Sequence, residues 1–505
     1  MGNTSRLVKN TAFLYIRMAI TMLIGLFSVR IVLRALGEVD YGVYNVVSGI
    51  VTMLAFLNNA LASTTQRFLS YEIPNNNTQK LKEIFSTSFY LYLLLCVLIV
   101  IAGETVGLWF INTKLNIPAD RMVAANWIYQ FSIISFCFSV MSASYNAAII
   151  AREKMQIYAY VSIVEAILKL SLLFLLLYLP GDKLIIYGLM MCVITIAIFI
   201  FDCCYCTSLF AECRLITGVD SSVLKKLGSF ASWNIFGTLS NIFSGQGLNI
   251  LLNVFFGVVV NTARGIAYQL DNAVNTLVQN FYMAVRPQIV KTISERNVDE
   301  TNKLLRLSTI IGYCLFSCVA IVFIFETRTI LRLWLQGFPE LTVHFTRIVL
   351  VAYFFEVLIT PLNMIISGTG KIKNFMLING LFNIAVLPLS YLLLKLYPIE
   401  TIPFYIILAI SIIRWINALY QTKLVYSIDH SNYLQIVIRL FFITMISVVC
   451  ILLLHMIISN IWILLVVDVI TVLLVYMFLV WVLLLSSEEK YIIRSRLEKV
   501  IKFTR

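Results

Sequence analysis

Long apolar segments separated by short polar ones dominate the chain. A bilayer core about 30 Å thick is crossed by about 20 residues of α-helix, and apolar segments of that length recur fourteen times. The pattern therefore predicts an all-α polytopic membrane protein. The predicted spans are 11–35, 41–65, 85–110, 123–149, 157–179, 183–206, 229–256, 258–284, 305–326, 345–367, 374–397, 402–423, 434–458 and 461–485.

Composition supports this interpretation and excludes several classes. Of the 505 residues, 60% are hydrophobic and only 12% are charged, whereas about a quarter of the residues in a soluble domain are charged. A cytosolic enzyme, a secreted disulfide scaffold and a nucleic-acid-binding domain are therefore excluded. The net charge of +13 would suit nucleic acid only if it formed one soluble basic patch.

The distribution of positive charge predicts the orientation. With the N-terminus inside, 24 lysines and arginines fall in inner segments and 7 in outer ones. Inner loops of membrane proteins are enriched in these residues, so we expect both termini to be cytoplasmic. The first apolar segment, which follows Arg6 and Lys9, is too long for a signal peptide and is interpreted as a retained membrane helix.

The chain contains an internal repeat. The segment KLKEIFSTS at 80–88 resembles TNKLLRLST at 301–309, and LWF at 108–110 recurs as LWL at 333–335. Repeats of an even number of spans have the same topology, and such parallel repeats are a transporter architecture. We expect an N-lobe of spans 1–6 (1–215), a C-lobe of spans 7–12 (216–430), a further helix pair (431–485) and a basic cytoplasmic tail (486–505).

Cysteines and histidines do not indicate a metal site. The cluster Cys203, Cys204, Cys206 and Cys213 has no nearby histidine and no recognised ligand spacing. The three histidines, His344, His430 and His455, are dispersed along the sequence. We therefore expect no metal site and no cofactor.

Several motifs carry a family resemblance. They are VRIVLRALGEVDYGVYNVVSG at 29–49, TQRFLSYEI at 65–73, FSTS at 85–88 and AVRPQIVKTI at 284–293. With two six-helix lobes and a terminal pair, the chain resembles the multidrug/oligosaccharidyl-lipid/polysaccharide (MOP) exporter superfamily. Within it, the motifs are most similar to the polysaccharide-repeat-unit flippases of O-antigen and capsule pathways.

The resemblance implies a function. Such flippases move an undecaprenyl-pyrophosphate-linked oligosaccharide from the inner to the outer leaflet of the bacterial cytoplasmic membrane by alternating access. They make and break no covalent bond, so the resemblance implies a transporter without catalytic residues. It further implies a cavity lined by spans 1, 2, 7 and 8. Expected partners are the lipid-linked oligosaccharide, the membrane and the glycosyltransferases and polymerase of the same pathway. We expect a monomer that binds no nucleic acid and that uses Na⁺ or H⁺ if an ion drives transport.

Charges inside spans are costly and are functional hypotheses by default. Arg17 on span 1 and Asp271 on span 8 lie about 9 and 10 Å from the inner boundary. We expect Asp271 to hold Arg17 in the empty site and to yield it to phosphate, which guanidinium groups bind bidentately. Arg30 and Arg264 are further candidate pyrophosphate ligands. For Arg30 the alternative is snorkelling to the outer interface, and for Arg17 and Arg264 it is structural pairing.

Polar side chains form stripes along the predicted cavity helices. Residues at helical spacing share a face, and these faces offer hydroxyls and amides that suit a sugar. Packing between membrane helices is the alternative, since polar residues also join helices. The candidate polar ligands are Tyr41, Asn45 and Ser48 on span 2, Asn234 and Asn241 on span 7, and Tyr268 and Asn275 on span 8.

Two charged pairs are expected within single lobes. Glu165 and Lys169 are spaced i,i+4 on span 5. Glu356 and Arg414 lie at equal depth near mid-membrane on spans 10 and 12. We expect structural ion pairs, with proton coupling at Glu165 or Glu356 as the alternative. Asp468 on span 14 has no explanation in the sequence.

Two other function classes remain open. A cation-coupled multidrug exporter of the same superfamily is the closest, but such exporters usually bind cations through acids of the first lobe, and span 1 offers arginines instead. A membrane polysaccharide polymerase or ligase is the other, but these enzymes normally have a sizeable outer loop, and the predicted loops are short.

Overall fold

The computed structural model describes residues 3–52, 55–114, 118–216, 221–256, 258–335, 338–458, 460–484 and 490. Regular structure in these ranges is helical throughout. That is the expected solution in lipid, where a helix satisfies its own backbone N–H and C=O groups. The predicted basic tail at 486–505 lies outside the described residues except for Lys490.

The chain divides into two compact units. The first unit is Met1–Leu239 with Met283–Arg296, and the second is Ser240–Tyr282 with Asn297–Arg505. The division falls within two long helices, α8 (Ser221–Phe256) and α9 (Val258–Ser294). The lobe boundary predicted at 215/216 stays a prediction.

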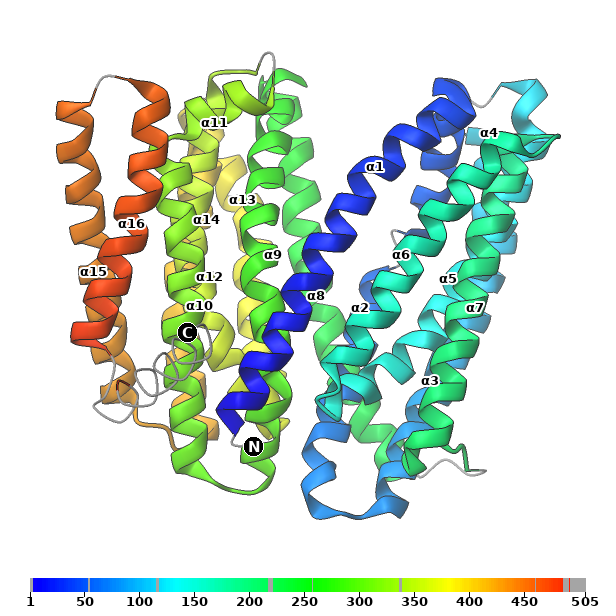
Figure 1. The fold of residues 1–505 in the computed structure, drawn as a ribbon, viewed down its shortest axis with the longest axis horizontal. Helices are drawn as coiled ribbons and strands as arrows, with labels where there is room; N and C mark the ends of the chain where they lie inside the picture. Colours follow the sequence, from blue (N-terminus) through cyan, green and yellow to red (C-terminus); the bar gives the residue numbers. More distant parts are fainter. Residues whose placement is uncertain are drawn as a thin grey trace, which may run out of the picture. The chain divides into compact units, whose positions relative to one another are not determined.

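Six further long helices and one short helix make up the first unit, shown from blue to green in Figure 1. A π-helical turn, Gly103–Gly107, connects the third of them to the short helix α4. The helices are α1 (Asn3–Thr52), α2 (Ala55–Glu72), α3 (Thr78–Ala102), α4 (Leu108–Lys114), α5 (Met122–Ala151), α6 (Met155–Tyr178) and α7 (Lys183–Leu209).

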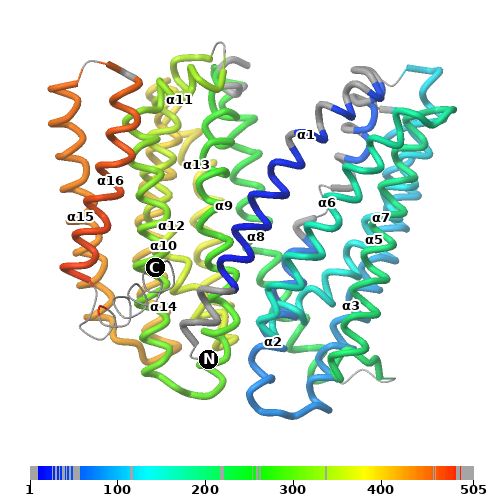
Figure 2. The backbone as a smooth tube through the Cα atoms, viewed as in Figure 1, coloured from blue at the N-terminus to red at the C-terminus, as the bar shows by residue number. Residues whose placement is uncertain are grey.

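The second unit has the remaining helices. The last two, α15 and α16, run side by side and pack against α10 (Figure 2). The helices are α10 (Val298–Phe325), α11 (Thr327–Trp334), α12 (Leu341–Thr369), α13 (Lys373–Leu396), α14 (Ile402–Val425), α15 (His430–Ile457) and α16 (Ile461–Leu483).

Ten helical segments among the described residues are long and apolar enough to cross a membrane. They correspond to ten of the fourteen predicted spans, so a polytopic membrane fold is confirmed and the count of fourteen is not. The other four predicted spans fall on α1, α2, α8 and α9. These are the helices predicted to line a polar cavity, and the polar residues that make them candidates also lower their hydropathy.

The predicted break between spans 1 and 2 is wrong. Helix α1 is unbroken from Asn3 to Thr52 and includes residues 36–40, where a loop was expected. One acidic residue of this segment, Asp40, is paired without a loop, because it accepts hydrogen bonds from Arg121 at the start of α5. The break in helix falls at residues 53–54 instead, which lie outside the described residues.

The two units share a packing order. In the first, α5 packs against α7 and α3, and α6 packs against α7. In the second, α12 packs against α14 and α10, and α13 packs against α14. The repeated motifs lie on the short helices that follow α3 and α10. LWF at 108–110 begins α4, and LWL at 333–335 lies at the end of α11. These equivalences support the internal repeat found in the sequence.

Ion pairs connect the ends of helices that were predicted to lie on the same side of the membrane. Arg121 bridges Asp40 and Asp182, all three from predicted outer ends. At the predicted inner ends, Arg152 pairs with Glu212 at 2.7 Å, and Lys80 pairs with Glu72 at 3.0 Å. The grouping agrees with the predicted topology of the first unit.

Candidate transport cavities

A polar cavity of about 470 Å³ lies within the first unit, among α2, α5, α6, α7 and the first-unit part of α9. Amide and hydroxyl side chains make up most of its lining, and Arg286 adds a guanidinium. Pockets for drug-sized ligands are usually lined by apolar and aromatic side chains with only a few polar groups, so this lining suits a more polar molecule or water. The polar lining residues are Asn58, Asn59, Ser63, Gln66, Ser139, Ser142, Asn146, Tyr158, Ser162, Glu165, Thr195 and Arg286.

An acid lies behind this cavity that the sequence analysis missed. Asp202 on α7 is fully buried, and it accepts hydrogen bonds from Ser142 and, at 3.2 Å, from Asn146. Its Oδ1 atom has no hydrogen-bond partner among the described residues. Asp202 is a charged residue inside predicted span 6, which is the kind of residue the sequence analysis selects. It was overlooked because it lies near the inner end of that span.

The predicted pair of Glu165 and Lys169 is present, with 2.6 Å between Oε1 and Nζ. Both residues line a second, smaller cavity of about 260 Å³, and Glu165 also lines the larger one. Ser48 lines the smaller cavity too, and its hydroxyl donates to the backbone oxygen of Tyr44 at 2.6 Å. The first unit thus has two acids at or beside its cavities, Glu165 on α6 and Asp202 on α7, although neither lies on predicted span 1.

Arg17 is held beside the larger cavity. Its guanidinium lies over the ring of Tyr158, 4.9 Å from the ring centre, and Tyr158 itself lines the cavity.

Asn234, on the first-unit part of α8, donates to the Thr64 hydroxyl at 3.3 Å. That contact joins two helices, which is the structural alternative for Asn234.

Three predicted ligands cannot be placed. Arg30, Tyr41 and Asn45 lie on helix α1, but their side chains are outside the described part of the structure. Their predicted contacts with substrate stay predictions.

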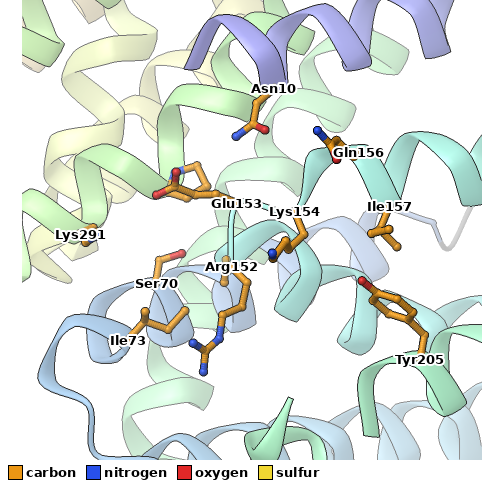
Figure 3. A pocket seen from close by; sticks show the side chains of 12 residues that line it. Asn10, Ser70, Ile73, Arg152, Glu153, Lys154, Gln156, Ile157, Tyr205 and Lys291 are labelled. Carbon is orange, nitrogen blue, oxygen red and sulfur yellow. The ribbon is translucent and has the colours of Figure 1, made fainter. Parts of the chain in front are cut away.

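A basic pocket of about 520 Å³ opens at the predicted inner end of the first unit. Figure 3 shows the side chains that line it, which come from α1, α2, α6, α7, α9 and the turn between α5 and α6. Arg152, Lys154 and Lys291 supply positive charge, and Arg152 is engaged by Glu212 at 2.7 Å. The sequence analysis proposed no substrate contact for any of these three residues.

The family motifs contribute directly to these two cavities. From TQRFLSYEI come Gln66 in the larger cavity and Ser70 in the basic pocket. From AVRPQIVKTI come Arg286 in the larger cavity and Lys291 in the basic pocket. Residues far apart in the sequence therefore meet in the first unit at sites with phosphate-compatible charge.

The second unit has a cavity of about 330 Å³ with a different character. Three predicted residues of α9 line it together: Arg264, Tyr268 and Asp271. The Arg264 guanidinium donates to the backbone oxygen of Gly245 at 2.9 Å and lies 4.5 Å from the centre of the Tyr268 ring. Asp271 is 4% exposed, and its Oδ1 atom has no hydrogen-bond partner among the described residues.

The same cavity contains the predicted pair of Glu356 and Arg414. Their Oε1 and Nη1 atoms are 2.6 Å apart, as the equal depths on spans 10 and 12 predicted. Asn241 also lines the cavity and accepts from Asn383 at 2.7 Å. Asn275 is not among the lining residues, and its side-chain oxygen accepts from Gln279.

The predicted switch between Arg17 and Asp271 stays a prediction. Arg17 belongs to the first unit and Asp271 to the second, so the pair and the central cavity that would contain it involve both units.

A cluster of His455, Asp468 and Glu326 in the second unit gives Asp468 a partner. Asp468, which the sequence left unexplained, is fully buried and bonds to Nε2 of His455 at 2.9 Å. Glu326 approaches the same nitrogen at 3.5 Å. The three histidines are dispersed along the sequence, but helix packing brings His455 to two acids from other parts of the chain.

Comparisons with known proteins agree with the fold. Residues 235–392 match the MatE family model. The outward-facing conformation of a multidrug resistance MATE family transporter of the MOP superfamily superposes with a TM-score of 0.71 at 13% identity, covering 83% of this chain and 95% of that one. The chain has the fold of the MOP superfamily. No curated protein matches it by sequence.

Two other MOP-fold structures are similarly close. One is a MOP superfamily transporter from Pyrococcus furiosus, described as having a binding pocket of reverse polarity that suggests a different function. The other is the MATE transporter ClbM in complex with Rb⁺. Each has a TM-score of 0.68 and 13% identity, with coverage of 83% of this chain and 95% of its own. At such identities the likeness concerns the fold and leaves the substrate open.

Proposed function

We propose that this MOP-fold protein is a membrane transporter that exports an amphiphilic substrate with a large polar part. The observation that carries the proposal is the first-unit cavity, with its many amide and hydroxyl groups beside Arg286. Drug-sized hydrophobic ligands favour predominantly apolar and aromatic pockets with few polar groups. A polyhydroxylated substrate fits this lining better.

The finer proposal is a lipid-linked oligosaccharide bearing a pyrophosphate. The basic pocket at the predicted inner end has Lys154 and Lys291 in its lining, and Arg17 stands near the larger cavity above Tyr158. Lysine binds phosphate as a point charge, and arginine binds it with two parallel hydrogen bonds. These positions would receive the pyrophosphate, while the amides and hydroxyls would contact sugars.

A cation-coupled multidrug exporter is the second candidate. The comparisons favour it, because the similar solved structures include a multidrug resistance transporter and MATE transporters. The buried carboxylate of Asp202, with an unpartnered oxygen among the described residues, also offers the acidic group such an exporter would use. Asp202 lies on α7 of the first unit, so this acid weakens the objection that span 1 offers arginines instead of acids.

A transport assay in proteoliposomes separates the two candidates. Vesicles containing the full chain receive either a labelled undecaprenyl-pyrophosphate oligosaccharide or a fluorescent lipophilic cation with an imposed Na⁺ or H⁺ gradient. The flippase proposal predicts movement of the lipid-linked sugar. It also predicts at least about a tenfold loss of rate in Lys154→Gln/Lys291→Gln, since each phosphate contact is charge-assisted and strong.

The matched control is Lys225→Gln/Lys226→Gln, which removes two exposed positive charges from α8 without touching the basic pocket. Its transport rate should equal that of the wild type. Cation efflux that requires Asp202, without movement of the lipid-linked sugar, would overturn the flippase proposal and favour the exporter.

A further inference from the structure

Three helices of the second unit bring a histidine and two carboxylates to one point. His455 lies two residues before the end of α15, Asp468 lies seven residues into α16, and Glu326 follows the last residue of α10. One ligand atom from each residue lies within 4.8 Å of the other two. This end of the unit is predicted to face the outside, and the cluster is separate from the transport cavity of the second unit.

The distances fit a small divalent cation. A tetrahedral metal with bonds of 2.0–2.1 Å holds its ligand atoms about 3.3 Å apart. The observed separations from Nε2 of His455 are 2.9 Å to Asp468 and 3.5 Å to Glu326. They lie on either side of that value, so only small side-chain rotations would be needed to surround an ion.

The carboxylate of Asp468 provides an independent indication. It is fully buried, and while Oδ2 contacts His455, Oδ1 has no hydrogen-bond partner among the described residues. Glu326 is only 4% exposed. Two buried carboxylates face a single imidazole, which can carry at most one positive charge, and buried charges need pairing or metal coordination.

We propose that Glu326, His455 and Asp468 form a binding site for a Zn²⁺-class transition metal. One imidazole nitrogen and two carboxylate oxygens match the donors that Zn²⁺ accepts, and three protein ligands leave one position open for water. His455 is partly exposed, which gives the ion a route from the surface. Because the ligands come from α10, α15 and α16, the ion would fasten the terminal helix pair to the rest of the unit.

The test uses the full chain in lipid nanodiscs, treated with a chelator and titrated with Zn²⁺ against a fluorescent zinc indicator. The wild type should bind one high-affinity equivalent, and its melting temperature should rise with Zn²⁺. Loss of a residue that hydrogen-bonds a metal ligand commonly weakens metal binding by about 10–100-fold, so loss of a direct ligand in His455→Ala or Asp468→Asn should weaken Zn²⁺ binding by about 100-fold or more. His344→Ala, which removes an exposed histidine of α12, should bind as the wild type does.

Two further variants distinguish a ligand from a structural hydrogen-bond donor. His455→Cys should retain Zn²⁺ binding, because thiolate is a zinc ligand, whereas His455→Gln should lose it although its amide can still bond Asp468. Co²⁺ substitution in the wild type should give tetrahedral absorption bands without the thiolate charge-transfer band that cysteine ligation would produce. Equal Zn²⁺ affinity in the wild type and His455→Ala, or thiolate ligation in the wild type, would overturn the proposal.

Discussion

The ion pair of Glu356 and Arg414 gives the sharpest test of how the second unit is stabilised. Their charged atoms are 2.6 Å apart, and their side chains are 26% and 17% exposed. Removing one partner of a fully buried pair destabilises a protein by about 3–5 kcal/mol, because the other charge is left without compensation. The partial exposure of this pair reduces the expected loss to about 2–3 kcal/mol for Glu356→Gln or Arg414→Gln.

The double variant Glu356→Gln/Arg414→Gln should behave differently. It removes both charges, and two amides can hydrogen-bond each other. Its free energy of unfolding should therefore lie within about 1 kcal/mol of the wild-type value. Combined with the two single variants, it gives a double-mutant cycle with a coupling free energy of about 3–6 kcal/mol, the amount by which the two single losses together exceed the loss of the double variant. Denaturant-induced unfolding of the full chain in mixed micelles measures all four free energies.

An exposed pair of the same unit serves as the control. Arg328 and Glu340 also form an ion pair, but their side chains are 56% and 59% exposed. Breaking an exposed pair changes stability by about 0–1 kcal/mol. If Glu356→Gln is no more destabilising than Glu340→Gln, or if the double variant loses the sum of the single losses, the reasoning from burial is wrong.

Three further predictions concern packing, backbone and hydrogen bonding, and each is measured as a change in the free energy of unfolding. A Cβ at Gly312 would lie 2.2 Å from the Tyr282 hydroxyl, which itself donates to a backbone oxygen of α12. Gly312→Ala should therefore destabilise the fold by about 1–3 kcal/mol. An unchanged free energy of unfolding would contradict the close approach. Gly265 has nothing within 4 Å of such a Cβ, so Gly265→Ala should stabilise helix α9 by up to about 1 kcal/mol, and a loss would show an unrecognised contact. Ser142→Ala removes a donor to buried Asp202 and should be destabilising by about 1.5–3 kcal/mol, whereas Asp202→Asn in the same background should recover part of that loss.

Depth in the bilayer explains why some long-range contacts were predictable. A membrane supplies one coordinate shared by every helix, so residues 356 and 414 could be set level by counting rise along their spans. The pair of Glu165 and Lys169 needed only helical spacing. Both ion pairs are present in the structure. Both pairs were therefore predictable from the geometry of a regular helix alone.

Lateral position was not available from the sequence. Asp468 meets His455 because α15 and α16 pack side by side along α10, and counting residues along spans does not say which helix faces are neighbours. Asp40 falls between predicted spans 1 and 2, where a loop was expected. Its bond to Arg121 satisfies that charge within a continuous helix, which hydropathy alone does not reveal.

The internal repeat makes the difference between the two units informative. Their helices pack in the same order, so the shared scaffold does not explain why one cavity is lined mainly by amides and hydroxyls, whereas the other contains Asp271 and the ion pair of Glu356 and Arg414. Under the proposed function, the first cavity contacts the polar part of the substrate. The second, where Asp271 lies beside the pair of Glu356 and Arg414, is then the place where a proton or cation would act on transport. Neutralising Asp271 as Asp271→Asn should accordingly change the dependence of transport on the ion gradient while leaving substrate binding to the first unit intact.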